Sequence, residues 1–247
     1  MEDMKKFGFT LAEVLITLGI IGVVAAMTLP TLIANMNSAR FRNQYKKTLS
    51  TLSQSGKIAQ ERFDYNYGDA RACSTESDSP FSTYSACAIF NGTLTGHRLK
   101  FGLPEGYNPE GTVESSAYPG AKIPNGMPHT PEQAAHVILS DGSMLVFNKN
   151  LTGCVLPPGK TLNYVDGTEH KRLLGDQCYA FIDINGPTLP NKEIVCDSGY
   201  TDPFNIGAEC DVTSDFNRSA DIYPIVFHDG SAEPATNAAR TILQTTK

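Results

Sequence analysis

A single acidic residue, Glu13, lies at the start of a long apolar stretch near the N-terminus. From Val14 to Ile33 the sequence contains no charged residue. A carboxylate inside a membrane-spanning helix costs about 2.5 to 3.5 kcal/mol on insertion scales, and less where it reaches the headgroups near a helix end. Glu13 is therefore expected either to pair with a cation or to lie at the membrane interface, and both interpretations stay open.

The apolar stretch is long enough to cross a membrane as one helix. Twenty residues lie between Val14 and Ile33, both included, and at roughly 1.5 Å per helical residue they cover about 30 Å, the thickness of the hydrocarbon core. A cleaved secretory signal is the alternative, but its apolar core usually has only about 7 to 15 residues. The longer run, followed by a helical pattern from Asn35 to Gln54, favours a retained membrane helix.

Two features of this stretch affect its shape and its contacts. Pro30 lacks a backbone donor, so the sequence predicts a kink or a locally extended stretch there, with a helix end at the membrane surface as the alternative. Small residues fall close to one side of the helix and would let neighbouring helices approach closely. They are Gly19, Gly22, Ala25 and Ala26.

The helical pattern resumes after Pro30 and becomes amphipathic. Apolar residues recur at steps of three, four or seven, namely Phe41, Tyr45, Leu49, Leu52, Ala59 and Phe63. The other positions of this helix include four basic residues, Arg40, Arg42, Lys46 and Lys47. They are expected to form a solvated helix face or to contact lipid headgroups and other subunits, and nucleic-acid binding is less favoured. The pattern predicts one long helix from about Phe9 to Phe63, whose second half packs on a globular domain.

The N-terminal segment resembles a known family. Lys5-Lys6-Phe7-Gly8, then Phe9-Thr10-Leu11-Ala12-Glu13-Val14-Leu15-Ile16, and Pro30 farther along, resemble the processing and methylation segment of type IV prepilins and type II secretion pseudopilins. The resemblance implies that a prepilin peptidase cuts after Gly8 and methylates the new N-terminal Phe9. It also implies that Glu13 meets the N-terminal amine of a neighbouring subunit. At about 4 Å and an effective dielectric near 20, such a pair attracts by about 4 kcal/mol.

The same resemblance implies a domain organisation and a function. Residues 1–8 would be a cleaved leader, 9–34 a transmembrane and assembly helix, 35–63 its amphipathic continuation, and 64–247 an extracytoplasmic globular domain. The implied function is a structural subunit of a type IV pilus-like or type II secretion pseudopilus filament. Its implied partners are prepilin peptidase, other pilin-like subunits, an inner-membrane assembly platform and the lipid bilayer.

The implied location is the inner membrane, crossed once, with a cytoplasmic leader and a periplasmic or surface domain. Two alternatives stay open. One is a membrane-tethered binding domain that does not polymerise, and the other is an exported enzyme with a membrane anchor.

Composition and motifs argue against two further classes of function. The 247 residues carry a formal charge of -6, and a mildly acidic chain is a poor general nucleic-acid binder, so no specific nucleic-acid partner is predicted. The sequence has no P-loop, GxSxG or HExxH motif, and its five histidines are scattered without ligand spacing. The chain is therefore predicted not to be an enzyme.

Six cysteines all follow the membrane segment, and none forms a CxxC pair. An even number in the exported part predicts disulfides formed in an oxidising compartment. Six cysteines allow fifteen pairings. The sequential pairing is mildly preferred because it closes three short loops, each restricting the unfolded chain by about 3 kcal/mol. It joins Cys73 to Cys87, Cys154 to Cys178, and Cys196 to Cys210.

One stretch has oxygen-bearing side chains suited to calcium. Asp183, Asn185 and the later Asn191 are expected at a strand end and in a loop, and calcium prefers oxygen ligands. The stretch lacks the spacing and terminal glutamate of an EF-hand. An Asn-Gly turn with Asp183 on the surface is the alternative. No other cofactor is predicted.

The sequence of the globular domain predicts mainly strands and loops. Strands are expected at residues 136–139 and 144–147, flanking a tight turn at 140–143, and again at 178–184 and 225–227. A proline-rich loop is expected at 107–131, turns at the two Asp-Gly-Ser sites, and a short helix at 235–244. A long helix packed on a small antiparallel sheet, with disulfides, is an α+β fold, and the pilin resemblance implies the same layout.

Overall fold

The computed structural model describes residues 10–104, 132–160, 162, 174–186, 188, 191–197, 210–214, 217 and 219–244. The predicted cleavage residues Gly8 and Phe9, and the loop predicted at 107–131, lie outside the described residues. The architecture is a long N-terminal helix packed on an antiparallel sheet, so the α+β prediction is confirmed.

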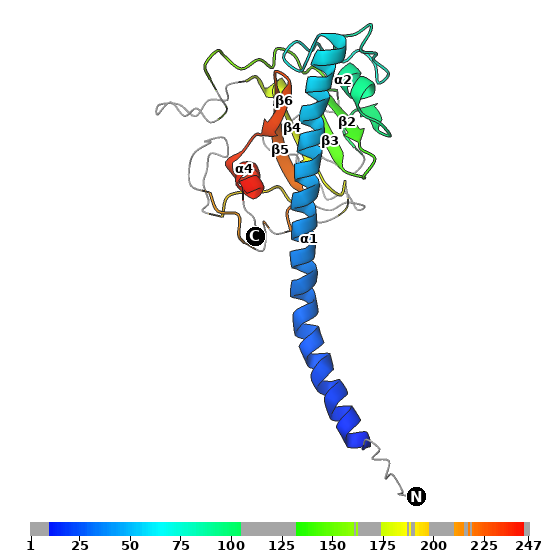
Figure 1. Cartoon of the computed structure of the whole chain (residues 1–247), viewed down its shortest axis with the longest axis vertical. Helices are drawn as coiled ribbons and strands as arrows, with labels where there is room; N and C mark the ends of the chain where they lie inside the picture. Colours follow the sequence, from blue (N-terminus) through cyan, green and yellow to red (C-terminus); the bar gives the residue numbers. More distant parts are fainter. Residues whose placement is uncertain are drawn as a thin grey trace, which may run out of the picture.

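Helix α1 (Leu11–Phe63) contains 53 residues and forms both the membrane segment and part of the domain core. Thr10 caps its N-terminus, and Asp64 ends it in the left-handed conformation with φ 62°. Figure 1 shows the N-terminal half of α1 projecting away from the domain, while the C-terminal half lies across the sheet. The predicted helix from about Phe9 to Phe63 is thus observed from Leu11 onward.

The structure contradicts two of the outcomes expected at Pro30. α1 continues without interruption past this residue, so the helix neither ends there nor becomes extended, while the kink stays a prediction. A proline inside a helix removes one N–H donor, but the bonds on either side can continue across that gap. Figure 1 shows a gradual curve of α1 over the half that projects from the domain.

The sheet is a six-stranded antiparallel meander in which each strand pairs with the next. Its strands are β1 (Arg98–Phe101), β2 (Ala134–Ile138), β3 (Met144–Asn148), β4 (Tyr179–Asp183), β5 (Ile222–His228) and β6 (Ser231–Pro234). The predicted hairpin is β2–β3, with Ile138 opposite Met144 and Gly142 at φ 86° in the turn. The strands predicted at 178–184 and 225–227 correspond to β4 and β5.

In the described part of the chain, four elements were not predicted from the sequence: α2 (Ala86–Thr93), the 3-10 helix η1 (Asp176–Cys178), β1 and β6. α2 begins at Ser85, whose hydroxyl oxygen accepts a hydrogen bond from the Ala88 N–H at 3.1 Å. β6 follows the Asp229-Gly230 turn, which was expected as a turn without a second strand. The C-terminal helix α4 (Asn237–Gln244) agrees with the prediction.

The apolar stripe of α1 forms the helix side of the core. Tyr45, Leu49, Leu52 and Ala59 are buried, while Phe41 and Phe63 pack against the core and are partly exposed. Tyr45 stacks on Tyr223 of β5 with ring centroids 4.3 Å apart. The predicted amphipathic second half of α1 is therefore confirmed.

Near its C-terminal end, α1 comes into close contact with the β5–β6 hairpin. Ser53 exchanges two hydrogen bonds with the backbone of Ala232, at 2.8 and 3.1 Å. A Cβ atom added at Gly56 would lie 2.7 Å from the carbonyl oxygen of Gly230. Only glycine permits this approach, which fixes the position of α1 on the sheet.

The six cysteines form three disulfides in the sequential pairing: Cys73–Cys87, Cys154–Cys178 and Cys196–Cys210. The first attaches the loop after α1 to α2. The second joins the coil after β3 to the start of β4, and the third closes a loop before β5. The first two disulfides thus tie coil segments to regular elements.

Candidate functional site

The N-terminal half of α1 presents an uninterrupted apolar surface. Leu11–Leu29 is long and apolar enough to cross a membrane, and none of this span is buried within the chain. The exposed fraction of its large aliphatic and methionine side chains ranges from 45% at Val14 to 79% at Leu11. An exposed apolar surface of this kind indicates contact with lipid or with other protein chains.

Two glycines in this half, Gly19 and Gly22, have open space around them in the described part of the chain. A Cβ atom added at Gly19 or Gly22 would meet nothing within 4 Å. Neither glycine is therefore needed for packing within the described part of the chain. Small residues do permit close helix–helix approach in an apolar medium, which agrees with the side identified in the sequence.

Glu13 has a partner within its own helix, which sequence reasoning missed. Its carboxylate accepts hydrogen bonds from the Thr10 backbone N–H at 2.9 Å and from the Thr10 hydroxyl at 2.8 Å. The Glu13 N–H donates in return to the Thr10 hydroxyl oxygen at 3.3 Å. This is a capping box, and the Thr-x-x-Glu pattern before an apolar run was its visible signal. The box satisfies two donors at the helix start.

The residues predicted to bind calcium do come together, but in a buried position. Asp183 is fully buried at the end of β4, which contradicts the alternative that placed it on the surface. Asn191 is also buried and has φ 48°. Sequence reasoning missed Asp221, which precedes β5 and is fully buried as well. Its carboxylate accepts hydrogen bonds from the N–H groups of Asn191 at 2.9 Å and Lys192 at 2.6 Å.

The two buried carboxyl groups affect each other's ionisation. Burial raises the pKa of Asp183 to about 9, and the nearby charge of Asp221 adds to the rise. Burial also raises the pKa of Asp221 to about 6, although backbone N–H groups donate to it. Burial and mutual repulsion therefore favour a pair that shares one proton over a pair with two negative charges.

Calcium binding at this position stays a prediction. Among the described residues, no group of three or more histidine, cysteine, aspartate or glutamate side chains could hold a metal ion. Asp183 and Asp221 would supply the charge of a calcium site, with amide oxygens of Asn185 and Asn191 as neutral ligands. A bound cation would displace the proton of Asp183.

Asp183→Asn is expected to stabilise the fold at alkaline pH in the presence of a chelator. The folded-state pKa of Asp183 lies above the unfolded value near 3.9, so its contribution is complete below pH 4 and is lost as the pH rises toward 9. Each pH unit in this window removes up to about 1.4 kcal/mol from the free energy of unfolding. Asparagine has nearly the same shape and no acidic proton, so the advantage of the variant should grow with pH up to about pH 9. Chemical denaturation across this pH range measures the difference.

Asp141→Asn is the matched control, with the opposite sign. Burial alone would raise the pKa of Asp141, but hydrogen bonds from Ser143 and Lys47 outweigh burial and lower this pKa. The Asp141 carboxylate therefore stabilises the fold above acidic pH. A loss of stability in Asp183→Asn at pH 8 would contradict the assignment. In separate samples, a calcium-dependent rise in Tm that Asp183→Asn abolishes would support calcium binding, whereas an unchanged wild-type Tm would contradict it.

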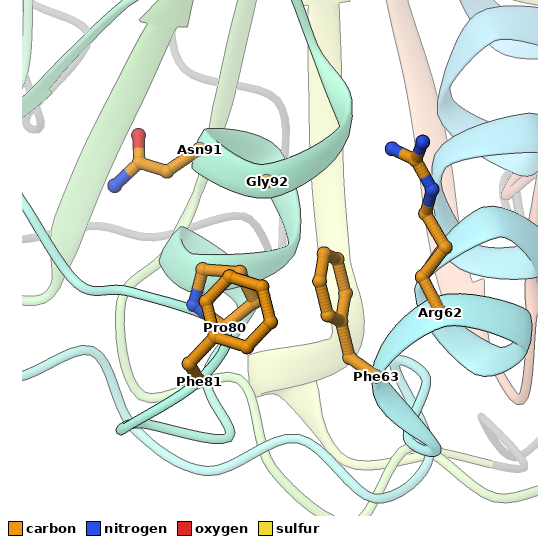
Figure 2. Close-up of a pocket in the computed structure, with 6 residues that line it drawn as sticks. All are labelled: Arg62, Phe63, Pro80, Phe81, Asn91 and Gly92. Atoms are coloured by element: carbon orange, nitrogen blue, oxygen red, sulfur yellow. The ribbon is translucent and has the colours of Figure 1, made fainter.

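An open groove lies at the end of α1 remote from the membrane segment. Figure 2 shows its lining residues, Arg62, Phe63, Pro80, Phe81, Asn91 and Gly92. Its volume is about 580 Å³. Phe81 is 84% exposed and meets Phe63 edge-on, with ring centroids 5.2 Å apart. The groove offers an apolar contact surface with one guanidinium at its margin.

Sequence reasoning missed this groove. The signal that could have indicated it is the pair Pro80-Phe81, which lies inside the loop closed by Cys73 and Cys87. Asp78 holds that loop by accepting hydrogen bonds from Ser74, Thr75 and Ser85. The Asn91 amide donates to two backbone carbonyls of the same loop, at 3.0 and 2.9 Å. The loop therefore presents Phe81 from a rigid base.

Comparisons with known proteins agree with the N-terminal features. No curated protein and no solved structure gives a match to the chain. Residues 3–29 match the family model of the prokaryotic N-terminal methylation motif. The motif implies processing by a prepilin peptidase, and together with the apolar helix it indicates a single-pass membrane anchor. The chain thus carries the N-terminal methylation motif that is the leader signature of type IV pilins and pseudopilins.

Proposed function

We propose that this chain is a structural subunit of a type IV pilus-like or type II secretion pseudopilus filament. In this proposal a prepilin peptidase removes the leader after Gly8 and methylates Phe9, and an inner-membrane platform assembles the subunits. The observation that carries the proposal is the division of α1: its N-terminal half is apolar and exposed along its length, while its other half is built into a folded domain.

This division suits a subunit that exchanges one apolar environment for another. Before assembly, lipid covers the span Leu11–Leu29. In a filament, the same surfaces of neighbouring copies would cover it, and Gly19 and Gly22 would allow close packing. The domain keeps its own core, so it need not refold during the transfer.

The charge pair of Glu13 would guide this assembly. In the single chain, Thr10 supplies the hydrogen bonds that the carboxylate needs. A neighbouring N-terminal amine would add a full positive charge, and an attraction of about 4 kcal/mol at 4 Å is larger than a neutral hydrogen bond provides. Glu13 would therefore keep its capping contact and gain a second partner.

The capping box also supports a second candidate function, a membrane-tethered domain that does not polymerise. Because Thr10 already satisfies Glu13, the carboxylate does not require a neighbouring chain. The exposed helix would then serve only as an anchor. Glu13 would contribute helix capping and nothing to association.

Mass spectrometry of the intact mature chain tests the proposed processing. In a host with working maturation machinery, the chain is expected to begin at Phe9 and to carry one added methyl group on its N-terminal amine. A chain that keeps its first eight residues, or that begins after Ala26, would overturn the proposal. A Gly8→Asp variant is the control, because a charged side chain at the cleavage position should leave the leader attached.

A further inference from the structure

Charge is unevenly divided between α1 and the rest of the chain. Residues 36–63 contain six basic residues and one acidic residue, a net charge of +5. Residues 64–247 contain 12 basic and 22 acidic residues, a net charge of -10. We define the basic collar as Arg40, Arg42, Lys46 and Lys47, which lie on one side of α1 where it enters the domain.

Part of this collar is left without a partner in the described chain. Lys47 pairs with Asp141 of the β2–β3 turn, its Nζ 3.1 Å from the carboxylate. Arg40 is exposed and Lys46 is half-buried, and neither has a contact with an acidic side chain among the described residues. Their charges are available to another molecule.

The edge of the domain nearest the collar is acidic. Ser143, which donates a hydrogen bond to Asp141, contacts Thr48 of α1. The strand ends at Met144, Asp183 and Ile222 line up beside it through their pairings. Coil joined to the start of β5 extends this edge, and Figure 1 shows it where α1 leaves the domain. We define the acidic rim as Asp141, Glu193, Asp197 and Asp211.

The rim has exposed and firmly held carboxylates. Asp197 and Asp211 are exposed. The Asp197 carboxylate accepts hydrogen bonds from the N–H groups of Thr213 at 2.6 Å and Ser214 at 2.8 Å, and its own N–H donates to the Asp211 carbonyl at 2.8 Å. These bonds fix the two acidic residues side by side.

The axial offset between copies brings collar and rim to the same level. This offset follows from the proposed function: if the Phe9 amine of one copy meets Glu13 of a neighbour, the two copies are offset by four residues, about 6 Å along the helix. Asp141 of the rim lies level with Gln44 and Lys47 of its own copy. Four residues of offset therefore place Arg40 and Arg42 of the next copy at that level, with Lys46 about one helical turn farther along.

We propose that the basic collar of one copy docks against the acidic rim of a second copy of this chain. The complementary charges carry the choice of partner, because the rim offers exposed carboxylates at Asp197 and Asp211 and the collar has exposed or half-buried cations at Arg40 and Lys46. An anionic lipid surface is the competing partner. The first collar residue, Arg40, lies 11 residues beyond Leu29, about 16 Å along the helix, whereas the interfacial layer is only about 5 to 8 Å thick.

Charge reversal of full-length mature chain tests this contact. Arg40→Glu/Lys46→Glu is expected to weaken self-association at low ionic strength at least about fivefold, and about 0.5 M salt should remove the difference from wild type. Lys57→Glu/Arg62→Glu is the matched control, with the same change of charge on the same helix outside the collar. Mixing the collar variant with an Asp211→Lys chain should restore association. Circular dichroism and Tm confirm that each variant folds.

A cross-linking experiment identifies the partner. Arg40→Lys keeps the charge and supplies an amine that carbodiimide can couple to a carboxylate in direct contact. Mixed nitrogen-15-labelled and unlabelled chains should give cross-links between copies, joining position 40 to peptides containing Asp197 or Asp211. Links only within one copy would overturn the proposal.

The remaining outcomes separate this contact from the filament proposal. Wild-type chain that stays monomeric in the membrane would overturn both. Wild-type chain that assembles, while Arg40→Glu/Lys46→Glu assembles equally well, would overturn the contact alone. Loss of binding to vesicles of anionic phospholipid, with unchanged self-association, would assign the collar to lipid instead.

Discussion

Gly56→Ala is expected to lower the free energy of unfolding by about 1 to 3 kcal/mol, which is the usual cost of overpacking a well-packed core. The new Cβ would lie 2.6 Å from the Tyr67 ring and 2.7 Å from the Gly230 carbonyl oxygen. Neither group can move freely, because Tyr67 is buried with its hydroxyl donating to the Leu52 carbonyl at 2.7 Å, and Gly230 is in the β5–β6 turn. At an open helical position the same change would stabilise by about 0.5 to 1 kcal/mol, so steric conflict decides the sign.

Thermal unfolding of the full chain in detergent micelles measures this effect. Gly22→Ala is the matched control, since its Cβ would meet nothing within 4 Å and it lies on the same helix. The control should unfold at the wild-type temperature or slightly above it. If Gly56→Ala matched the control, α1 and the β5–β6 hairpin would not be in the close contact described above.

Glu13→Gln is expected to insert and fold normally but to lose filament assembly, by about a thousandfold in the association constant. The attraction of about 4 kcal/mol between carboxylate and amine corresponds to nearly three factors of ten. Glutamine can still accept hydrogen bonds at the third helical position, so the capping box with Thr10 is kept. The substitution thus removes the charge and leaves the local structure. Filament yield by sedimentation, at equal membrane level, measures the loss.

Thr10→Ala provides the reciprocal control. It removes the hydroxyl of the capping box while leaving the Glu13 charge in place, at an expected cost of about 0.5 to 2 kcal/mol to the helix start. This variant should still assemble. Assembly by Glu13→Gln at the wild-type level, or equal failure of both variants, would assign Glu13 to capping and favour the tethered-domain alternative.

The features that sequence predicted well depend on strong periodic or covalent signals. The apolar stripe from Phe41 to Phe63 repeats for more than six turns, so α1 was predicted over nearly its whole length. The turn containing Asp141 and Gly142 placed the β2–β3 hairpin to within two residues. The sequential disulfides follow from short loops between neighbouring cysteines, and the structure contains these three.

The features that sequence missed depend on tertiary packing. Residues Ala86–Phe90 of α2 are all buried, so the helix has no polar stripe to mark its period. β1 and β6 have four residues each, too few to show a clear alternation. The burial of Asp183 could not be read from its neighbours, because Asp221 approaches it from 38 positions farther along the chain.

Pro30 shows how a local rule can be outweighed. Taken alone, the residue predicts a break, but the sequences on both sides favour a helix and the loss of one hydrogen bond does not end it. The distal groove shows the reverse case. Phe81 is conspicuous only after the fold places it beside Phe63, 18 positions earlier in the chain.

The continuity of α1 gives the membrane half and the domain half a common rotational phase. Each helical residue turns the chain by about 100° and advances it by about 1.5 Å. One residue inserted between Leu29 and Arg40 would swing the whole sheet by about 100° around the helix axis, whereas seven would nearly restore its direction and raise it by about 10 Å. The length of this connecting stretch thus sets which side of the domain each molecule turns toward the next.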